Sequence, residues 1–244
     1  MLTVRAAAER GHADHGWLRT WHSFSFADYV DPRYMGWGAL RVLNEDIIAP
    51  GTGFGMHGHR DMEIVTYVLA GALTHRDSMG HTTTLHAGEV QRMSAGRGVL
   101  HSEVNHGREP VHLLQIWIVP AVRGIEPGYE QKAFDPALKH GRLHPIALPV
   151  AQAQAWGESA AAPVRLHADA ALYAGCLDGA QRVTHTLAPG RMGYVHVVRG
   201  RLELNGVALG AGDAAMLADV TTLELAEGRN AELLLFDLAA DAAL

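Results

Sequence analysis

Short β-prone runs separated by turn residues fill the first half of the chain. They are the stretch from Ile64 to Leu69 and the segments ALTHRDS, TTTLHAGEVQRMSAG, VLHSEVNH and VHLLQIWIVP. Turn residues separate these runs at intervals of roughly ten residues, which is typical of an all-β barrel or sandwich. In this half, no convincing stretch longer than about two turns has the period of an amphipathic helix. The pattern therefore predicts an all-β fold.

The same pattern returns from Val164 to the end of the chain. Its strand-like segments are VRLHADAALYAGCL, RVTHTLAPG, MGYVHVVRGRLELNGVALGAGDAAML, TTLELAEG and ELLLFDL. Within them, Asn205-Gly206 is the strongest signal for a β-hairpin in the sequence. Between the two halves, Pro120 to Gln154 is irregular and rich in turn residues, and we interpret it as the connection between domains. We expect one domain over residues 1–135 and a second over residues 136–244.

The two halves resemble a weak internal repeat. PGTGFGMHGH…IVTYVLAGAL in the first half has a counterpart in PGRMGYVHVVRGRLELNG, and HAGEVQRMSAG resembles ALGAGDAAML. The second copy lacks both the His-x-His and the His-x-Glu pattern of the first. We therefore expect the second domain to be degenerate and to hold no metal.

Composition narrows the class of protein. Of the 244 residues, 48% are hydrophobic and 19% are charged, which indicates a packed globular protein. The formal net charge is −6 and no run of Lys and Arg is present, which argues against direct binding of nucleic acid. Cys176 is the single cysteine, so neither an internal disulfide nor a cysteine-based zinc site is expected. No signal peptide and no run of about 20 apolar residues is evident, so we expect a cytoplasmic protein without a membrane span.

Four residues carry the candidate chemistry: His57, His59, His101 and Glu103. Each pair has the spacing i, i+2, and side chains on a β-strand repeat with a period of two, so both members of a pair point to one face. Two such strands around a shared interior can hold one metal ion. Imidazole and carboxylate ligands together suit a divalent transition metal better than calcium or magnesium.

The glycines and histidines of this region resemble the two-part signature of the cupin superfamily. More narrowly, HGHRDMEIVTYVLAG followed by MSAGRGVLHSE resembles the pirin family, and so does the opening stretch RGHADHGWLRTWHSFSFADYVDPRYMGWGALRV. The close resemblance covers about the first 130 residues, and two motifs in the right order are a far more specific signal than a lone His-x-His. The general cupin signature takes Glu63 as the carboxylate ligand, whereas the pirin pattern takes Glu103. We expect Glu103, because it lies beside His101 at period two.

The resemblance implies a fold, a metal and an activity. The fold is a bicupin, in which two antiparallel β-barrels of the jelly-roll type lie face to face and only the N-terminal barrel binds metal. The metal ligands would be His57, His59, His101 and Glu103, and the metal would be Fe(II) first, with Mn, Ni, Co, Cu or Zn as alternatives. The family reaction opens the heterocyclic ring of flavonols such as quercetin with dioxygen and releases carbon monoxide. In that quercetin 2,3-dioxygenase reaction Glu103 would be the catalytic base.

Two other functions fit the same sequence. The pirin family also includes transcriptional co-regulators that act through protein partners, and other cupins are isomerases or hydrolases of small metabolites. The enzyme reading requires a largely apolar pocket at the metal and a small aromatic, flavonol-like substrate, and the protein is expected to be a monomer. Phe54, Met56 and Met93 are candidates for the pocket mouth. Five other histidines of the first half are expected at the surface or in loops: His75, His81, His86, His106 and His112.

Overall fold

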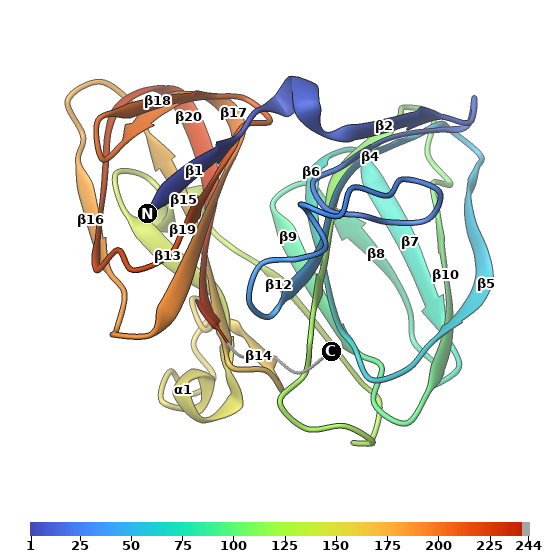
Figure 1. Ribbon diagram of the computed structural model, residues 1–244. Coiled ribbons are helices and arrows are strands. Elements are labelled where there is room, and N and C mark those ends of the chain that lie inside the picture. Colours follow the sequence, from blue (N-terminus) through green and yellow to red (C-terminus); the bar gives the residue numbers. More distant parts are fainter. Residues whose placement is uncertain (241–244) are drawn as a thin grey trace.

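The computed structural model describes residues 1–240, and its regular secondary structure is almost wholly β-strand, arranged in two barrels (Figure 1). Within residues 1–240, neighbouring strands pair antiparallel, except β13 and β14, which run parallel. The predicted all-β bicupin is therefore confirmed. None of the helices in the part of the chain that the structure describes has the length and apolar character needed to span a bilayer.

The first barrel consists of two sheets. One has seven strands in the order β12-β9-β6-β11-β4-β3-β2, and the other has four in the order β5-β10-β7-β8. Their bounds are β2 (Gly11–Asp14), β3 (Leu18–His22), β4 (Leu40–Ile48), β5 (Gly53–His59), β6 (Glu63–Ala70), β7 (Ala72–Asp77), β8 (Thr82–His86), β9 (Glu89–Ser94), β10 (Val99–Val104), β11 (Val111–Ile118) and β12 (Gly128–Ala133).

The second barrel is a nine-stranded sheet in the order β1-β19-β17-β20-β15-β13-β14, with β16 paired to β20 and β18 paired to β17. Its strands are β1 (Leu2–Arg5), β13 (Leu143–Pro149), β14 (Val164–Leu166), β15 (Ala170–Leu177), β16 (Val183–Thr186), β17 (Arg191–Leu204), β18 (Val207–Gly210), β19 (Ala214–Leu217) and β20 (Thr222–Ala239). The helical segments are the α-helix α1 (Val150–Gln154) and the 3-10 turns η1 (Ala7–Glu9) and η2 (Pro136–Leu138).

The Asn205-Gly206 hairpin is present between β17 and β18. Leu204 pairs with Val207 across the turn, and Asn205 and Gly206 have φ values of 49° and 78°. Two consecutive positive φ values are what a type I′ turn requires, and Asn-Gly is the sequence that adopts them at least cost. This prediction is confirmed.

Apolar side chains from both barrels form one shared core. Leu43 and Ile116 of the first barrel belong to the same cluster of buried residues as Leu234 and Phe236 of the second. Separate clusters fill the interior of each barrel. The barrels therefore pack face to face through apolar surface that neither could leave in water without a large cost in free energy.

The connection between the barrels is more ordered than its composition indicates. Residues Pro120 to Gln154 include β12, which pairs with β9 of the first barrel, and β13, which pairs with β15 of the second. The passage between the barrels occupies residues 134–142, so it lies within the predicted connection but is shorter than expected. The turn-rich composition concealed β12 and β13 because both strands lie among prolines and glycines.

The first strand does not stay with the domain that follows it. β1 pairs with β19, so it lies in the sheet of the second barrel, while β2 lies in the first (Figure 1). The domain boundary between residues 135 and 136 stays a prediction. Strand β1 belongs to the first predicted domain in sequence but lies in the second barrel in space. Residues 241–244 of the second predicted domain lie outside the described residues.

Candidate metal centre

Strands β5 and β10 bring the predicted ligands together. The two strands pair antiparallel with His101 opposite His57, and a bulge between His101 and Glu103 places Glu103 opposite Phe54. Burial alternates along β10. His101 and Glu103 are buried, whereas Leu100, next to His101, is 50% exposed. The period-two reasoning for this pair is therefore correct, and both side chains face the barrel interior.

His57, His59 and His101 form a compact cluster. One ligand atom from each ring lies within 4.8 Å of the other two. The ring centroids of His57 and His101 are 4.4 Å apart, and those of His59 and His101 are 4.9 Å apart. The His57 Nδ1 lies 2.8 Å from the carbonyl oxygen of Gly55, which fixes the ring and leaves its Nε2 for a ligand.

Glu103 lies next to this cluster but is grouped differently. Its carboxylate, together with His75 and His101, forms a second set of ligand atoms within 4.8 Å of one another. Its Oε2 accepts a hydrogen bond of 2.8 Å from the Gln115 side chain, and its Oε1 lies 3.4 Å from both Gln91 Nε2 and Thr66 Oγ1. Burial raises the pKa of Glu103 to about 7, although the hydrogen bonds from Gln91 and Gln115 act in the opposite direction.

Glu63, the alternative carboxylate, faces elsewhere. It is buried on β6, and its Oε2 accepts a 3.0 Å hydrogen bond from the backbone N–H of His167 in the second barrel. This contact ties the two barrels together. The geometry therefore favours Glu103 over Glu63 as the carboxylate beside the histidines.

The cluster has the properties of a metal site. Burial, with smaller contributions from neighbouring histidines, lowers the pKa of His101 to about 3 and that of His59 to about 4, so both rings are neutral at physiological pH. Neutral imidazole offers a lone pair, which is the form that binds metal. Among residues 1–240, neither ring nitrogen of His101 has a hydrogen-bond partner although the residue is 1% exposed. A metal ion would satisfy such a buried donor atom, so the residues fit the group that the sequence implies.

The histidines face a cavity of about 420 Å³ inside the first barrel. Its walls carry the aromatic rings of Trp17, Phe26, Phe54 and Trp117, and the Trp117 ring packs edge-on against His59 at 4.9 Å. The full lining is His15, Trp17, Leu18, Thr20, His22, Phe26, Ala27, Asn44, Asp46, Phe54, His57, His59, His101, Glu103, Gln115 and Trp117. A cavity of this size lies in the range of about 300–1,000 Å³ that small-molecule sites occupy.

Of the three residues expected at the mouth, Phe54 lines the cavity. The prediction for Met93 is wrong, because this residue is fully buried in a separate apolar cluster with Ile64 and Val99. Met56 is 55% exposed, because it alternates with His57 on β5 and points away from the interior.

The sequence analysis did not identify several residues that line the cavity or contact Glu103. Asp46 and Thr20 line the cavity from β4 and β3, and burial raises the pKa of Asp46 to about 6. Gln91 and Gln115 hold Glu103. Their inward positions follow from strand alternation, but nothing in the sequence alone connects β3, β4, β9 and β11 to the histidine motifs.

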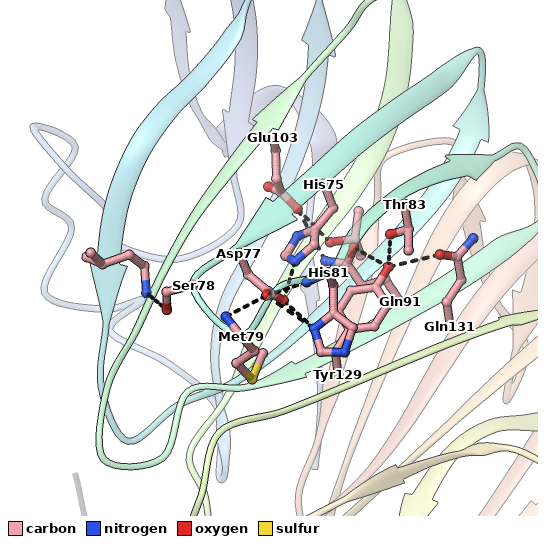
Figure 2. A network of polar contacts seen from close by, with 12 residues as sticks. His75, Asp77, Ser78, Met79, His81, Thr83, Gln91, Glu103, Tyr129 and Gln131 are labelled. Carbon is pink, nitrogen blue, oxygen red and sulfur yellow. Dashed lines mark hydrogen bonds and ion pairs between the residues drawn. The ribbon is translucent and has the colours of Figure 1, made fainter.

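The structure corrects the prediction for His75. The expectation of a surface or loop position is wrong, since His75 lies on β7 with 0% exposure and its ring nitrogen Nε2 is 3.0 Å from the Asp77 carboxylate (Figure 2). Alternation along THRD, with Arg76 exposed, turns His75 and Asp77 inward. Of the others, His86 and His106 are exposed as expected.

Comparison with known proteins identifies the family. The model of the family described as Pirin matches residues 3–118, and that of the Quercetinase C-terminal cupin domain matches residues 157–238. The chain belongs to the pirin family. The two matches place this pirin's histidine cluster in the N-terminal Pirin region.

Relatives match along nearly the whole chain. A protein named quercetin 2,3-dioxygenase from Escherichia coli (strain K12) is 44% identical over 98% of this chain and 99% of its own length. A pirin-like protein from Caulobacter vibrioides is 43% identical over 98% of this chain and 100% of its own. The crystal structure of the bacterial pirin YhhW from Escherichia coli in complex with nickel(II) is 42% identical, with a TM-score of 0.91 over 99% of this chain and 100% of that one.

Proposed function

We propose that this protein is a metal-dependent dioxygenase that opens the heterocyclic ring of flavonols such as quercetin and releases carbon monoxide. The carrying observation is that three clustered histidines and a buried carboxyl group share one aromatic-walled cavity. The relative named quercetin 2,3-dioxygenase supports the substrate class. The proposed substrates are a small flavonol-like aromatic molecule and dioxygen, and the proposed location is the cytoplasm. We propose a monomer, because the two barrels already cover each other's apolar faces.

The proposed ligands are His57, His59 and His101, with Glu103 as the fourth. Fe(II) is our first choice of metal, and Mn, Ni, Co, Cu and Zn are alternatives, because such donor sets accept several divalent ions. When bound, the metal supplies Lewis-acid and redox chemistry for the reaction of the substrate ring with dioxygen.

The cavity walls suit a flat, hydroxylated aromatic ring. Trp17, Phe26 and Trp117 offer ring faces and edges for stacking, and they keep water away from the reacting atoms. Asp46 and Thr20 interact with each other at the cavity wall, and within the described part of the chain Trp117 Nε1 is buried and has no hydrogen-bond partner. Such an N–H group favours a ligand that brings its own hydroxyl oxygen, because an unpartnered buried polar atom costs about 1–3 kcal/mol.

Glu103 is the proposed base. Its raised pKa, about 7, allows the carboxylate to take a proton from a phenolic hydroxyl near neutral pH. Gln115 donates to Oε2 and so holds the carboxylate in one orientation. The proton would therefore move to a fixed atom on β10 beside His101.

The test is turnover of quercetin by protein loaded anaerobically with one metal at a time, with carbon monoxide measured as the product. We expect carbon monoxide in proportion to bound metal. His101→Ala should lose both metal and turnover while it keeps the β circular dichroism spectrum. His86→Ala is the matched control, because that side chain is 65% exposed on β8 and should change neither.

Two results would contradict the proposal. Full metal occupancy in His101→Ala would contradict the assignment of His101 as a ligand. Tight metal binding without turnover for iron, manganese, nickel, cobalt and copper would contradict the dioxygenase activity and favour the co-regulator function.

A further inference from the structure

The inner face of the four-stranded sheet carries donor atoms on both sides of β10. On one side, β5 provides His57 and His59. On the other side, β7 pairs with β10 in a register that places His75 opposite Glu103 and Asp77 opposite His101. All four of these β7 and β10 side chains are buried. The β7 side of this sheet is not used by the proposed dioxygenase site.

The β7 side completes a separate set of ligand atoms. One atom each from His75, His101 and Glu103 lies within 4.8 Å of the others, and His57 and His59 are not members of this set. Two imidazoles and one carboxylate form the donor set that non-haem Fe(II) sites use with further positions open. The set therefore suits a divalent transition ion and not merely a structural hydrogen bond.

His75 is held in the manner of a metal-binding histidine. Its Nε2 lies 3.0 Å from Asp77 Oδ2, and Asp77 is itself fixed, since Oδ1 accepts from the backbone N–H groups of Met79 and His81 at 2.9 and 3.1 Å (Figure 2). A carboxylate on one ring nitrogen sets the tautomer and leaves the lone pair on the other. That other atom, Nδ1, has no hydrogen-bond partner among residues 1–240, although the ring is fully buried. In the view of Figure 2 the ring lies between the Asp77 and Glu103 side chains.

His101 can serve either side of β10. Neither of its ring nitrogens has a hydrogen-bond partner within the described residues, so no contact fixes which of the two carries the lone pair. A neutral imidazole has one lone pair, and the ring can present it toward β5 or toward β7. His101 is thus the one histidine common to both donor sets.

We propose that His75, His101 and Glu103 form a second divalent-cation position, alternative to the three-histidine position, with His75 as the ligand unique to it. An ion at this second position takes His75 together with His101 and Glu103, whereas an ion at the proposed dioxygenase position takes His57 and His59 together with His101 and Glu103. The proposal concerns cation binding and stands separately from the dioxygenase reaction.

The experiment removes the first position and asks whether the second still binds. The parent variant is the full-length chain with His57→Ala and His59→Ala, titrated with Co²⁺ and followed by visible absorption and by metal analysis. We expect it to bind one Co²⁺. Adding His75→Phe, which keeps a ring beside Tyr129 but cannot ligate, should weaken that binding at least about 10–100-fold, the loss typical of removing even an outer-shell partner.

The matched control adds His86→Ala to the same parent. The His86 side chain is 65% exposed on β8 and lies outside both donor sets, so Co²⁺ binding should equal that of the parent. If His75→Phe disturbs the circular dichroism spectrum, His75→Asn, which keeps a polar group next to Asp77, takes its place. A parent that binds no Co²⁺, or a His75 variant that binds as tightly as the parent, overturns the proposal.

Discussion

Asp46 illustrates how the cavity sets the chemistry of a single residue. Its carboxyl group is 3% exposed, and burial raises its pKa from 3.8 to about 6. A group whose pKa is higher in the folded chain than in the unfolded chain destabilises the fold once it ionises. Asp46 should therefore reduce the stability of the metal-free protein as the pH rises from about 4 to about 6, and the loss should persist above pH 6.

Asp46→Asn tests this pH dependence. Because the amide cannot ionise, the free energy of unfolding of the variant relative to that of the wild type should rise by up to about 3 kcal/mol between pH 4 and pH 7. Urea unfolding of the metal-free proteins at several pH values measures it. Asp28→Asn, at an exposed position, should show no such trend. A difference that does not change with pH would contradict the prediction.

At the scale of strands, the close approach of β5 to β10 is what brings the ligand pairs together. Gly53 is the point of closest contact, since a Cβ atom there would lie 2.2 Å from the carbonyl oxygen of Glu103. Any larger residue must push the strands apart. Gly55, two residues further along β5, has no atom within 4 Å of its ideal Cβ position.

Gly53→Ala should therefore damage the site, and Gly55→Ala should not. For Gly53→Ala we expect a loss of about 1–3 kcal/mol in the free energy of unfolding, as for other overpacked positions, together with weaker metal binding. Gly55→Ala should stay within about 0.5 kcal/mol of the wild type. Chemical unfolding and metal titration of both variants provide the comparison. Equal effects would show that contact with β10 is not the reason for glycine at position 53.

The candidate ligand motifs could be found in the sequence because each is local to one strand. His101 and Glu103 obey a period of two, which needs no knowledge of the neighbouring strands. His75 and Asp46 could not be placed, because their roles depend on the pairing of β7 with β10 and on the position of β4 across the barrel. The all-β class, the hairpin at Asn205 and the two-barrel architecture also followed from local patterns or from the resemblance. The path of β1 did not, since it depends on a contact with β19 near the other end of the chain.

At the scale of the molecule, Arg5 joins the barrels. It lies on β1 in the sheet of the second barrel, is 1% exposed, and reaches the loop between β3 and β4 of the first. There it donates a 2.9 Å hydrogen bond to the Tyr29 hydroxyl, and its guanidinium group lies 3.6 Å from the centre of the Tyr34 ring.

Arg5→Ala should lower the free energy of unfolding by about 2 kcal/mol, because the substitution removes a desolvated cation–π contact and a partly buried hydrogen bond. Arg33→Ala is the control: the Arg33 guanidinium group lies 5.4 Å from the centre of the same Tyr34 ring, but its side chain is 76% exposed. Its midpoint of unfolding should match that of the wild type. Thermal unfolding of the two variants tests this prediction. A similar loss of stability in both would show that the burial of Arg5 does not determine its contribution.

The core shared by the barrels has a consequence for how such a protein can change over generations. If the two halves arose by duplication of one ancestral barrel, the copy without the histidine motifs has still kept the apolar strands that cover its neighbour. A gene shortened to the first copy would encode a protein with that face open to water and without the sheet in which its own first strand pairs. Selection that keeps the histidine-bearing barrel therefore also keeps the barrel that covers it, and the pair is inherited as one unit.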